Sequence, residues 1–217
     1  MHMQRLLAVC VAAAFAGTAA AAAAEDLPKL NVKVVGNYST VIQTPKAEVP
    51  FWTKQIPENS NGQITADYNQ QDILGVKDFQ VLRLTQSGVT DFGVGDISKM
   101  AGDDPVFEGC DLAGITTDIE TARAACDAWK PAMAEAMEKR FNTKLMALGN
   151  NPPIVFWCNT PIAGIEDLKG KKVRIFNTTQ ADFVDAVGAT TVTMAFSEVV
   201  PALERGVVDC ALTGTLS

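Results

Sequence analysis

The segment from Glu166 to Thr213 constrains the fold more than any other part of the chain, because short apolar runs alternate in it with amphipathic ones. Three runs have the β-branched or alternating pattern of strands, and the two between them place apolar residues at helical spacing. The predicted strands are 172–175, 190–194 and 206–210, and the predicted helices are 179–187 and 197–203, the second with Ser197 available as its N-cap. This order predicts parallel strands joined by helices, as in α/β proteins.

Arg174 lies near the carboxyl end of the first of these strands, directly before a predicted helix. In open α/β sheets, ligands bind at the edge where the carboxyl ends of the strands meet. A guanidinium beside the free N–H groups of a helix capped by Thr178 or Thr179 would form a seat for a carboxylate or phosphate. The competing interpretation is a surface arginine in a solvated ion pair with an acid nearby in the sequence, such as Asp182.

The rest of the chain continues the same alternation of strands and helices. A helix is predicted over 45–57, with Phe51 in the core, and a long amphipathic helix over 117–141. The other predictions are a helix over 76–85 and strands over 30–35, 64–68, 91–94 and 143–148.

Two motifs in the opening segment carry a family resemblance: DLKGKKVR at 167–174 and VGATTVTMAFSEVVPALERGVVD at 187–209. They resemble the signature of the periplasmic solute-binding subunits of TRAP (tripartite ATP-independent periplasmic) transporters, which typically read DLKGLKIR and GATPVPMPFSEVYTALQTGVVDG. Residues 51–75 and 82–95 show a weaker similarity to the same family. The resemblance covers nearly all of the chain after residue 28.

The resemblance implies a periplasmic-binding-protein-like α/β fold, with two α/β lobes joined by a hinge. On this basis we expect lobe I over 25–151, incomplete, and lobe II with the start of the return hinge over 152–217, truncated. The boundary is expected at Gly149–Pro153, a run rich in turn-forming residues. The resemblance further implies that a C-terminal part is missing and that the chain is a fragment.

In the family, the arginine of the first motif holds the carboxylate of the solute, and the matching residue here is Arg174. One such contact is worth about 1.5 to 3 kcal/mol, whereas a micromolar ligand needs about 8 kcal/mol. Most of the affinity must therefore come from enclosure between the lobes. The residues expected to enclose the ligand are Phe156, Trp157, Phe176 and Phe196, with Asn177 as a polar contact.

Three further ligand contacts are expected from the resemblance, each with a competing structural role. Asn37 follows the first strand and could simply serve a turn. Asp96 could equally be a helix N-cap. Thr213 replaces a ligand-facing Asn of the family, so its hydroxyl either contacts the ligand or plays no part. The chain lacks the second arginine that several members carry near Pro153, and this favours an apolar or aromatic carboxylate.

Residues 1–24 have the pattern of a secretory signal peptide: Arg5, then an apolar stretch, then a run of alanines that ends before Glu25. The apolar stretch is shorter than the roughly 20 residues of a membrane span. We therefore expect export to the periplasm, signal cleavage and no direct membrane insertion afterwards.

The composition argues against several functions. The chain has 18 basic and 25 acidic residues, a balance that does not favour nucleic acid as a partner. Its single histidine is His2, inside the leader, which excludes histidine-dependent nucleophilic catalysis and most catalytic zinc sites. Paired carboxylates such as Asp185 and Glu198 belong to no catalytic motif. We expect no enzymatic activity, no catalytic residue, no cofactor and no metal.

Four cysteines remain after the leader, and they permit three pairings or none. Export to an oxidising compartment favours disulfides, but four buried free thiols are an open alternative. The family resemblance favours Cys158 with Cys210 and, less firmly, Cys110 with Cys126.

The function implied by the resemblance is a periplasmic solute-binding protein. Its expected partners are a small organic carboxylate and the membrane permease subunits of a TRAP transporter, which would take up the solute. The alternative is the ligand-sensing extracytoplasmic domain of a receptor, which the same fold could serve.

Overall fold

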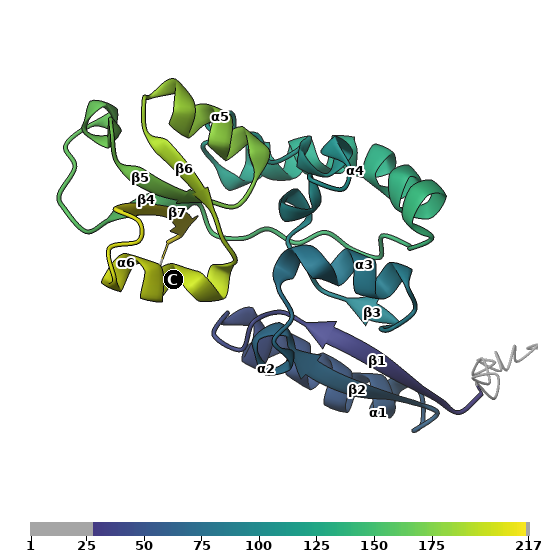
Figure 1. Cartoon of the computed structure of the whole chain (residues 1–217). Coiled ribbons are helices and arrows are strands. Elements are labelled where there is room, and N and C mark those ends of the chain that lie inside the picture. The colour runs from purple at the N-terminus through teal and green to yellow at the C-terminus, as the bar shows by residue number, and fades with distance from the viewer. Residues whose placement is uncertain (1–27, 216–217) are drawn as a thin grey trace, which may run out of the picture.

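The computed structural model describes residues 28–215, which fold into two α/β parts with separate sheets and separate hydrophobic cores (Figure 1). The predicted leader, residues 1–24, lies outside the described residues. One core cluster draws its members from 35–148 and the other from 156–212. This is the two-lobed α/β architecture expected from the sequence. None of the helices in the described range is long and apolar enough to cross a membrane.

We propose that the boundary between the lobes falls in the turn-rich stretch 149–153, which lies between the two core clusters. Residues 28–151 are called lobe I below, and residues 152–215 are called lobe II.

Lobe I is built on a three-stranded parallel sheet in the order β2-β1-β3. The strands are β1 (Leu30–Gly36), β2 (Ile64–Gln70) and β3 (Phe92–Gly93). Val32, Val34 and Val35 make β1 the buried centre of the sheet. The polar loop that follows β1 therefore leaves the sheet at the carboxyl ends of its strands.

The helical segments of lobe I pack around this sheet (Figure 1). The longest is α4 (Ile119–Phe141), whose N-cap Asp118 accepts a hydrogen bond from the backbone N–H of Thr121. Its buried residues Met133 and Met137 belong to the lobe I core. The others are η1 (Thr44–Glu48), η2 (Phe51–Gln55), α1 (Ile56–Asn59), α2 (Gln71–Leu74), η3 (Asp78–Gln80), α3 (Val81–Gln86), η4 (Ile97–Met100) and η5 (Pro105–Glu108).

Lobe II contains the predicted strand–helix–strand–helix–strand unit: β5 (Lys172–Ile175), α5 (Thr178–Ala186), β6 (Thr190–Thr193), α6 (Val199–Glu204) and β7 (Cys210–Gly214). The sheet order is β4-β7-β5-β6, with β4 (Ile154–Cys158) antiparallel to β7 and the other pairs parallel. The short turns η6 (Ile165–Leu168) and η7 (Phe196–Glu198) complete the lobe. Strand β5 is central, so Arg174 lies inside the sheet, paired with Ala211 and Val192.

Two strand predictions are wrong. Residues 143–148 form no strand; Leu145 and Leu148 pack against the lobe I core instead, so their apolar pattern reflects burial without a strand partner. The strand predicted over 206–210 begins only at Cys210. Gly206 has a positive φ of 67° and ends the preceding helix with a turn, which delays the strand.

The predicted helix caps are also wrong. Asn177 caps α5, and its side chain accepts a hydrogen bond from the backbone N–H of Gln180, as the strong preference for Asn at this position allows. Helix α6 begins at Val199 after the turn η7, so Ser197 is not its cap.

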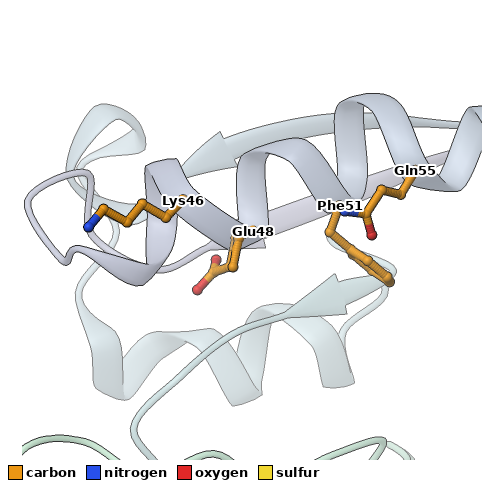
Figure 2. Close-up of a pocket in the computed structure, with 5 residues that line it drawn as sticks. Lys46, Glu48, Phe51 and Gln55 are labelled. Atoms are coloured by element: carbon orange, nitrogen blue, oxygen red, sulfur yellow. The ribbon is translucent and has the colours of Figure 1, made fainter.

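Phe51 is not a core residue, because 41% of its surface is exposed. It lies in the predicted helix over 45–57, which begins with the π-helical stretches η1 and η2. A π-helix has more residues per turn than an α-helix, so side chains rotate away from the faces that α-helical spacing predicts. Phe51 instead lines a shallow surface pocket with Lys46, Ala47, Glu48 and Gln55 (Figure 2).

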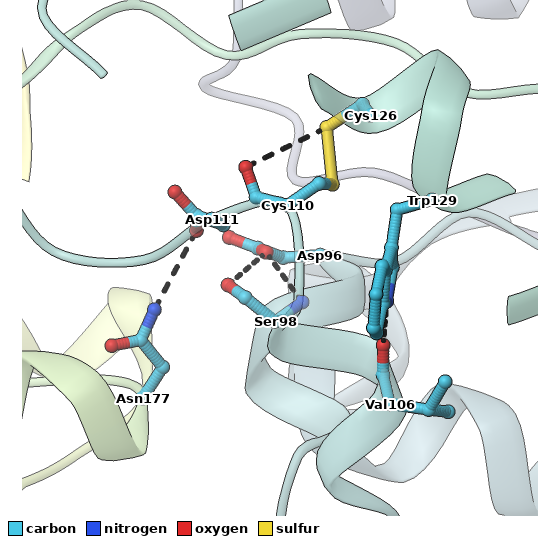
Figure 3. Close-up of a disulfide and its surroundings, with 8 residues drawn as sticks. All are labelled: Asp96, Ser98, Val106, Cys110, Asp111, Cys126, Trp129 and Asn177. Carbon is cyan, nitrogen blue, oxygen red and sulfur yellow. Dashed lines mark hydrogen bonds between the residues drawn. A yellow bond between two sulfur atoms is a disulfide. The ribbon is translucent and has the colours of Figure 1, made fainter. Parts of the chain in front are cut away.

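Two disulfides are present among the described residues, and they are the pairings favoured by the family resemblance. Cys110 and Cys126 tie the segment after η5 to α4, with 4.8 Å between their Cα atoms (Figure 3). Cys158 and Cys210 join β4 to β7 across directly paired positions, with 4.0 Å between their Cα atoms. Each disulfide therefore lies within one lobe and leaves the two lobes covalently joined by the chain alone.

The disulfides are expected to stabilise the protein unequally, because they close loops of different length. The sequence separations are 52 residues for Cys158–Cys210 and 16 residues for Cys110–Cys126. Loop-closure entropy then predicts losses of about 4 and about 3 kcal/mol in the free energy of unfolding. Urea unfolding of Cys158→Ala/Cys210→Ala and Cys110→Ala/Cys126→Ala measures both losses. A larger loss for the second variant would contradict the prediction.

Candidate functional site

Arg174 is the largest fully buried side chain among the described residues, with 1% of its surface exposed. Its Nε and Nη2 donate to the main-chain oxygen of Met194 at 3.1 and 3.0 Å, and its Nη1 donates to that of Leu212 at 2.8 Å. A guanidinium has five N–H groups, so these bonds leave one N–H on each terminal nitrogen. Two parallel N–H groups are what a carboxylate needs for bidentate binding.

The charge of Arg174 is not neutralised by an ion pair within residues 28–215. Burial lowers its pKa to about 10, against the opposing effect of Asp78 and Asp96. A pKa in this range leaves the guanidinium protonated at neutral pH. The surface ion pair considered from the sequence is therefore wrong, because the side chain is enclosed by protein and directed at backbone oxygens.

The N-terminus of α5 is not available to an anion, contrary to the sequence-based expectation. The backbone N–H of Gln180 donates to Asn177, the cap residue, at 3.0 Å. The backbone N–H of Thr179 donates to the carboxylate of Glu108, from lobe I, at 2.7 Å. Glu108 therefore occupies the place that a ligand carboxylate would need at the helix end, and the guanidinium of Arg174 is left as the anion seat.

Aromatic rings from both lobes surround this seat. The ring of Phe176 lies 5.0 Å from the Cζ atom of Arg174 and 4.9 Å from the Nζ atom of Lys99, measured to the ring centroid. The ring of Phe196 packs edge-on against Tyr38, with 5.4 Å between centroids. Tyr38 and Lys99 belong to lobe I, and both phenylalanines belong to lobe II. The rings of Tyr38, Phe176 and Phe196, called the aromatic wall below, therefore come from both lobes.

Tyr38 brings an unpaired hydroxyl to the site. The residue is 5% exposed, and its hydroxyl lies near the backbone N–H of Asp78 without a hydrogen bond of normal geometry. Burial, followed by the charge of Asp78, raises the pKa of this phenol to about 12, while Arg174 acts in the opposite direction. The hydroxyl therefore stays protonated and can donate a hydrogen bond to a bound molecule.

Acidic and basic side chains of the two lobes meet beside the aromatic wall. Lys99 forms an ion pair with Asp78 at 2.6 Å and lies 3.5 Å from a carboxylate oxygen of Asp96. Lys77 of lobe I pairs with Glu198 of lobe II at 3.0 Å. Glu198 also accepts a hydrogen bond from the backbone N–H of Ala195 in its own lobe.

Arg174 and Phe176 are in contact, and Phe196 lies two residues after Met194, whose carbonyl oxygen accepts hydrogen bonds from Arg174. Asn177 is occupied by its capping bond and by a long contact to Asp111 of lobe I at 3.5 Å (Figure 3). Thr213 follows Leu212, whose carbonyl oxygen holds Arg174. The candidate contacts of lobe II remain Arg174, Phe176, Asn177, Phe196 and Thr213.

Four other expected contacts have structural roles. Asn37 accepts a hydrogen bond from the backbone N–H of Tyr38, in the turn geometry considered from the sequence. Asp96 caps η4 by accepting from the backbone N–H and hydroxyl of Ser98 (Figure 3). Phe156 packs against Phe183 and the lobe II core.

Trp157 donates to the main-chain oxygen of Gly214 and is 38% exposed. Of the four residues with structural roles, Asn37, Asp96, Phe156 and Trp157, only Asp96 lies at the charged cluster beside Arg174.

Sequence reasoning missed Tyr38, Asp78 and Lys99. Tyr38 lies in the loop that was expected to reach the ligand, one position after the residue chosen there. Asp78 and Lys99 are 21 residues apart in the chain, on η3 and η4, and no motif links them. Residues 28–215 contain no group of three or more His, Cys, Asp or Glu side chains arranged to hold a metal ion.

A buried, unpaired cation and aromatic rings lie where the two α/β lobes meet. This is the architecture of a two-lobed ligand-binding protein. The chain belongs to the DctP family, bacterial extracellular solute-binding protein family 7, whose model matches residues 36–215.

Two curated relatives illustrate the family. Over 212 residues the chain is 30% identical to the C4-dicarboxylate-binding periplasmic protein DctP of Rhodobacter capsulatus, covering 90% of this chain and 60% of that protein. It is 25% identical over 179 residues to the uncharacterized protein YiiZ of Salmonella typhimurium, covering 80% of this chain and 54% of the relative. The chain thus spans less than two thirds of either relative.

Solved structures share the fold. DctP7 of Bordetella pertussis, an extracytoplasmic solute receptor binding pyroglutamic acid, has a TM-score of 0.77 at 22% identity, over 85% of this chain and 60% of that one. A TRAP periplasmic solute-binding protein of Haemophilus influenzae with bound L-gulonate has a TM-score of 0.73 at 22% identity, over 84% and 60% of the two chains.

The unpaired hydroxyl of Tyr38 gives a prediction on stability. Tyr38→Phe is expected to leave the free energy of unfolding of the ligand-free protein unchanged or to raise it, because a buried hydroxyl without a partner carries a desolvation cost. Tyr68 is the matched control, since its hydroxyl donates to Glu48 at 3.1 Å, and Tyr68→Phe should cost about 1 kcal/mol. Urea unfolding compares the two; a larger loss for Tyr38→Phe would show that its hydroxyl is bonded.

Proposed function

We propose that this protein captures a small organic carboxylate in the periplasm and delivers it to the membrane permease of a TRAP transporter for uptake. The observation that carries the proposal is Arg174: a buried guanidinium without an acidic partner, which contacts the ring of Phe176 from lobe II and is affected by the phenol of Tyr38 from lobe I. Membership of the family supports the proposal, as do relatives described with pyroglutamic acid or L-gulonate as ligands.

In the proposed binding mode, the charge of Arg174 and the apolar contacts of the aromatic side chains both contribute to affinity. The two remaining N–H groups of Arg174 hold the carboxylate, while Phe176 and Phe196 cover the body of the ligand and Tyr38 donates a hydrogen bond. One bidentate contact is worth about 1.5 to 3 kcal/mol, so the apolar contacts must supply most of the roughly 8 kcal/mol of micromolar binding. This requires both lobes, because Tyr38 comes from one and the phenylalanines from the other.

We propose binding without catalysis. Glu198, which was considered as a catalytic carboxylate, pairs with Lys77 and bonds the backbone of Ala195, and the hydrogen bond to Lys77 lowers its pKa. A carboxylate with a lowered pKa and two partners is a poor general base.

Replacement of the buried cation tests the proposal. Arg174→Ala is expected to abolish carboxylate binding that isothermal titration calorimetry detects for the complete protein, because the anion would lose both its charge partner and its donors. Arg205→Ala is the matched control: it removes the same charge from an exposed position of lobe II and should bind normally. Circular dichroism must show that both variants are folded. Near-unchanged affinity of folded Arg174→Ala would refute the assignment.

A further inference from the structure

The buried ion pair of Asp78 and Lys99 lies directly beside the proposed anion seat. Both side chains are nearly enclosed, with 2% of Asp78 and 10% of Lys99 exposed, and their charged atoms are 2.6 Å apart. Lys99 and Arg174 contact the same phenylalanine ring, at 4.9 and 5.0 Å from its centroid. A second cation is therefore present at the site, but a carboxylate of the protein already holds it.

The other charges around the seat follow the same pattern. Lys77 is paired with Glu198, and Asp96 adds a further negative charge 3.5 Å from Lys99. Asp78 and Asp96 are the two charged groups that act most strongly on Arg174. Among the described residues at the site, Arg174 alone keeps a positive charge without a carboxylate partner. One ligand carboxylate would give it a direct partner, and a second would face Asp78 and Asp96.

We propose that the site selects monocarboxylates over dicarboxylates, and that Asp78 determines this specificity by neutralising Lys99. The inference rests on the proposed function, since it assumes that Arg174 holds the ligand. Like charges brought together in a partly desolvated site repel strongly. A second ionised carboxylate on the ligand therefore lowers the affinity and does not merely fail to increase it. The relative from Rhodobacter capsulatus is described as binding C4-dicarboxylates, and the inference assigns this chain a different ligand class.

The ligand that fits has one carboxylate, an uncharged body that packs on Phe176 and Phe196, and an acceptor for the hydroxyl of Tyr38. An amide or carbonyl oxygen would serve as that acceptor. A dicarboxylate and its half-amide have nearly the same shape and differ by one charge, which makes them suitable probes of this inference.

The experiment is isothermal titration calorimetry of the complete protein with two matched pairs: succinate with succinamate, and terephthalate with 4-carbamoylbenzoate. The wild type is expected to bind the half-amide of a pair at least tenfold more tightly than the diacid. Asp78→Asn removes the nearer of the two carboxylates that hold Lys99, with little change in shape, and should move this ratio at least tenfold toward the diacid. Asp78→Asn/Lys99→Met removes both charges and should restore the preference for the half-amide.

The outcomes separate this inference from the function on which it rests. A wild type that binds the diacids as tightly as the half-amides overturns the inference and leaves carboxylate binding intact, as does an unchanged ratio in folded Asp78→Asn. If Asp78→Asn does not fold, the ratios of the wild type and of the double variant decide, because the two should agree within about threefold. Binding of none of the four probes would count against the proposed function as well.

Discussion

The bonds between Arg174 and the main-chain oxygens of Met194 and Leu212 are the interaction on which the site depends. They hold a long, flexible side chain in one place without using a carboxylate. Backbone carbonyl groups offer partial negative charge that reduces the cost of burying a cation but does not cancel its full charge. The protein therefore keeps a buried guanidinium in position without a carboxylate partner, whereas an ion pair would hold it equally well but neutralise its charge.

The sheet of lobe II makes this arrangement possible. Arg174 lies in β5, between β6 and β7, and its partners come from these two neighbours: Met194 directly follows β6, and Leu212 is within β7. Parallel strands bring the carboxyl ends of all three segments to one edge. The three bonds thus need the complete strand–helix–strand–helix–strand unit, and a change in strand register would separate the guanidinium from both oxygens.

Much of this arrangement could be predicted from the sequence, because its parts are local. The bounds of β5, the neighbouring helices and the position of Arg174 near a strand end follow from residue patterns within lobe II. What could not be predicted depends on contacts between distant segments. Glu108 reaches the N-terminus of α5 from 71 positions away, and Lys99 is neutralised by Asp78 on another helical turn.

Phe156 shows that a residue pattern alone does not decide which face of a sheet a side chain occupies. Its apolar side chain indicates burial, but the choice between the two faces of the sheet requires the register. Opposite Leu212 in β7, Phe156 packs in the core of its lobe and not at the junction.

The contacts between the lobes are individually weak, and this has a consequence for ligand capture. The Lys77–Glu198 pair is nearly half exposed on both sides, a setting in which ion pairs contribute about 0 to 1 kcal/mol. The Glu108–Thr179 bond is only part-buried, and one further part-buried bond lies beside it, from the backbone N–H of Ala113 to the hydroxyl of Thr179. A ligand held by Arg174 and Phe196 from lobe II and by Tyr38 from lobe I would add contacts of comparable strength between the lobes. Binding and association of the lobes would then favour each other, because a ligand shifts a conformational equilibrium by its difference in affinity for the two states.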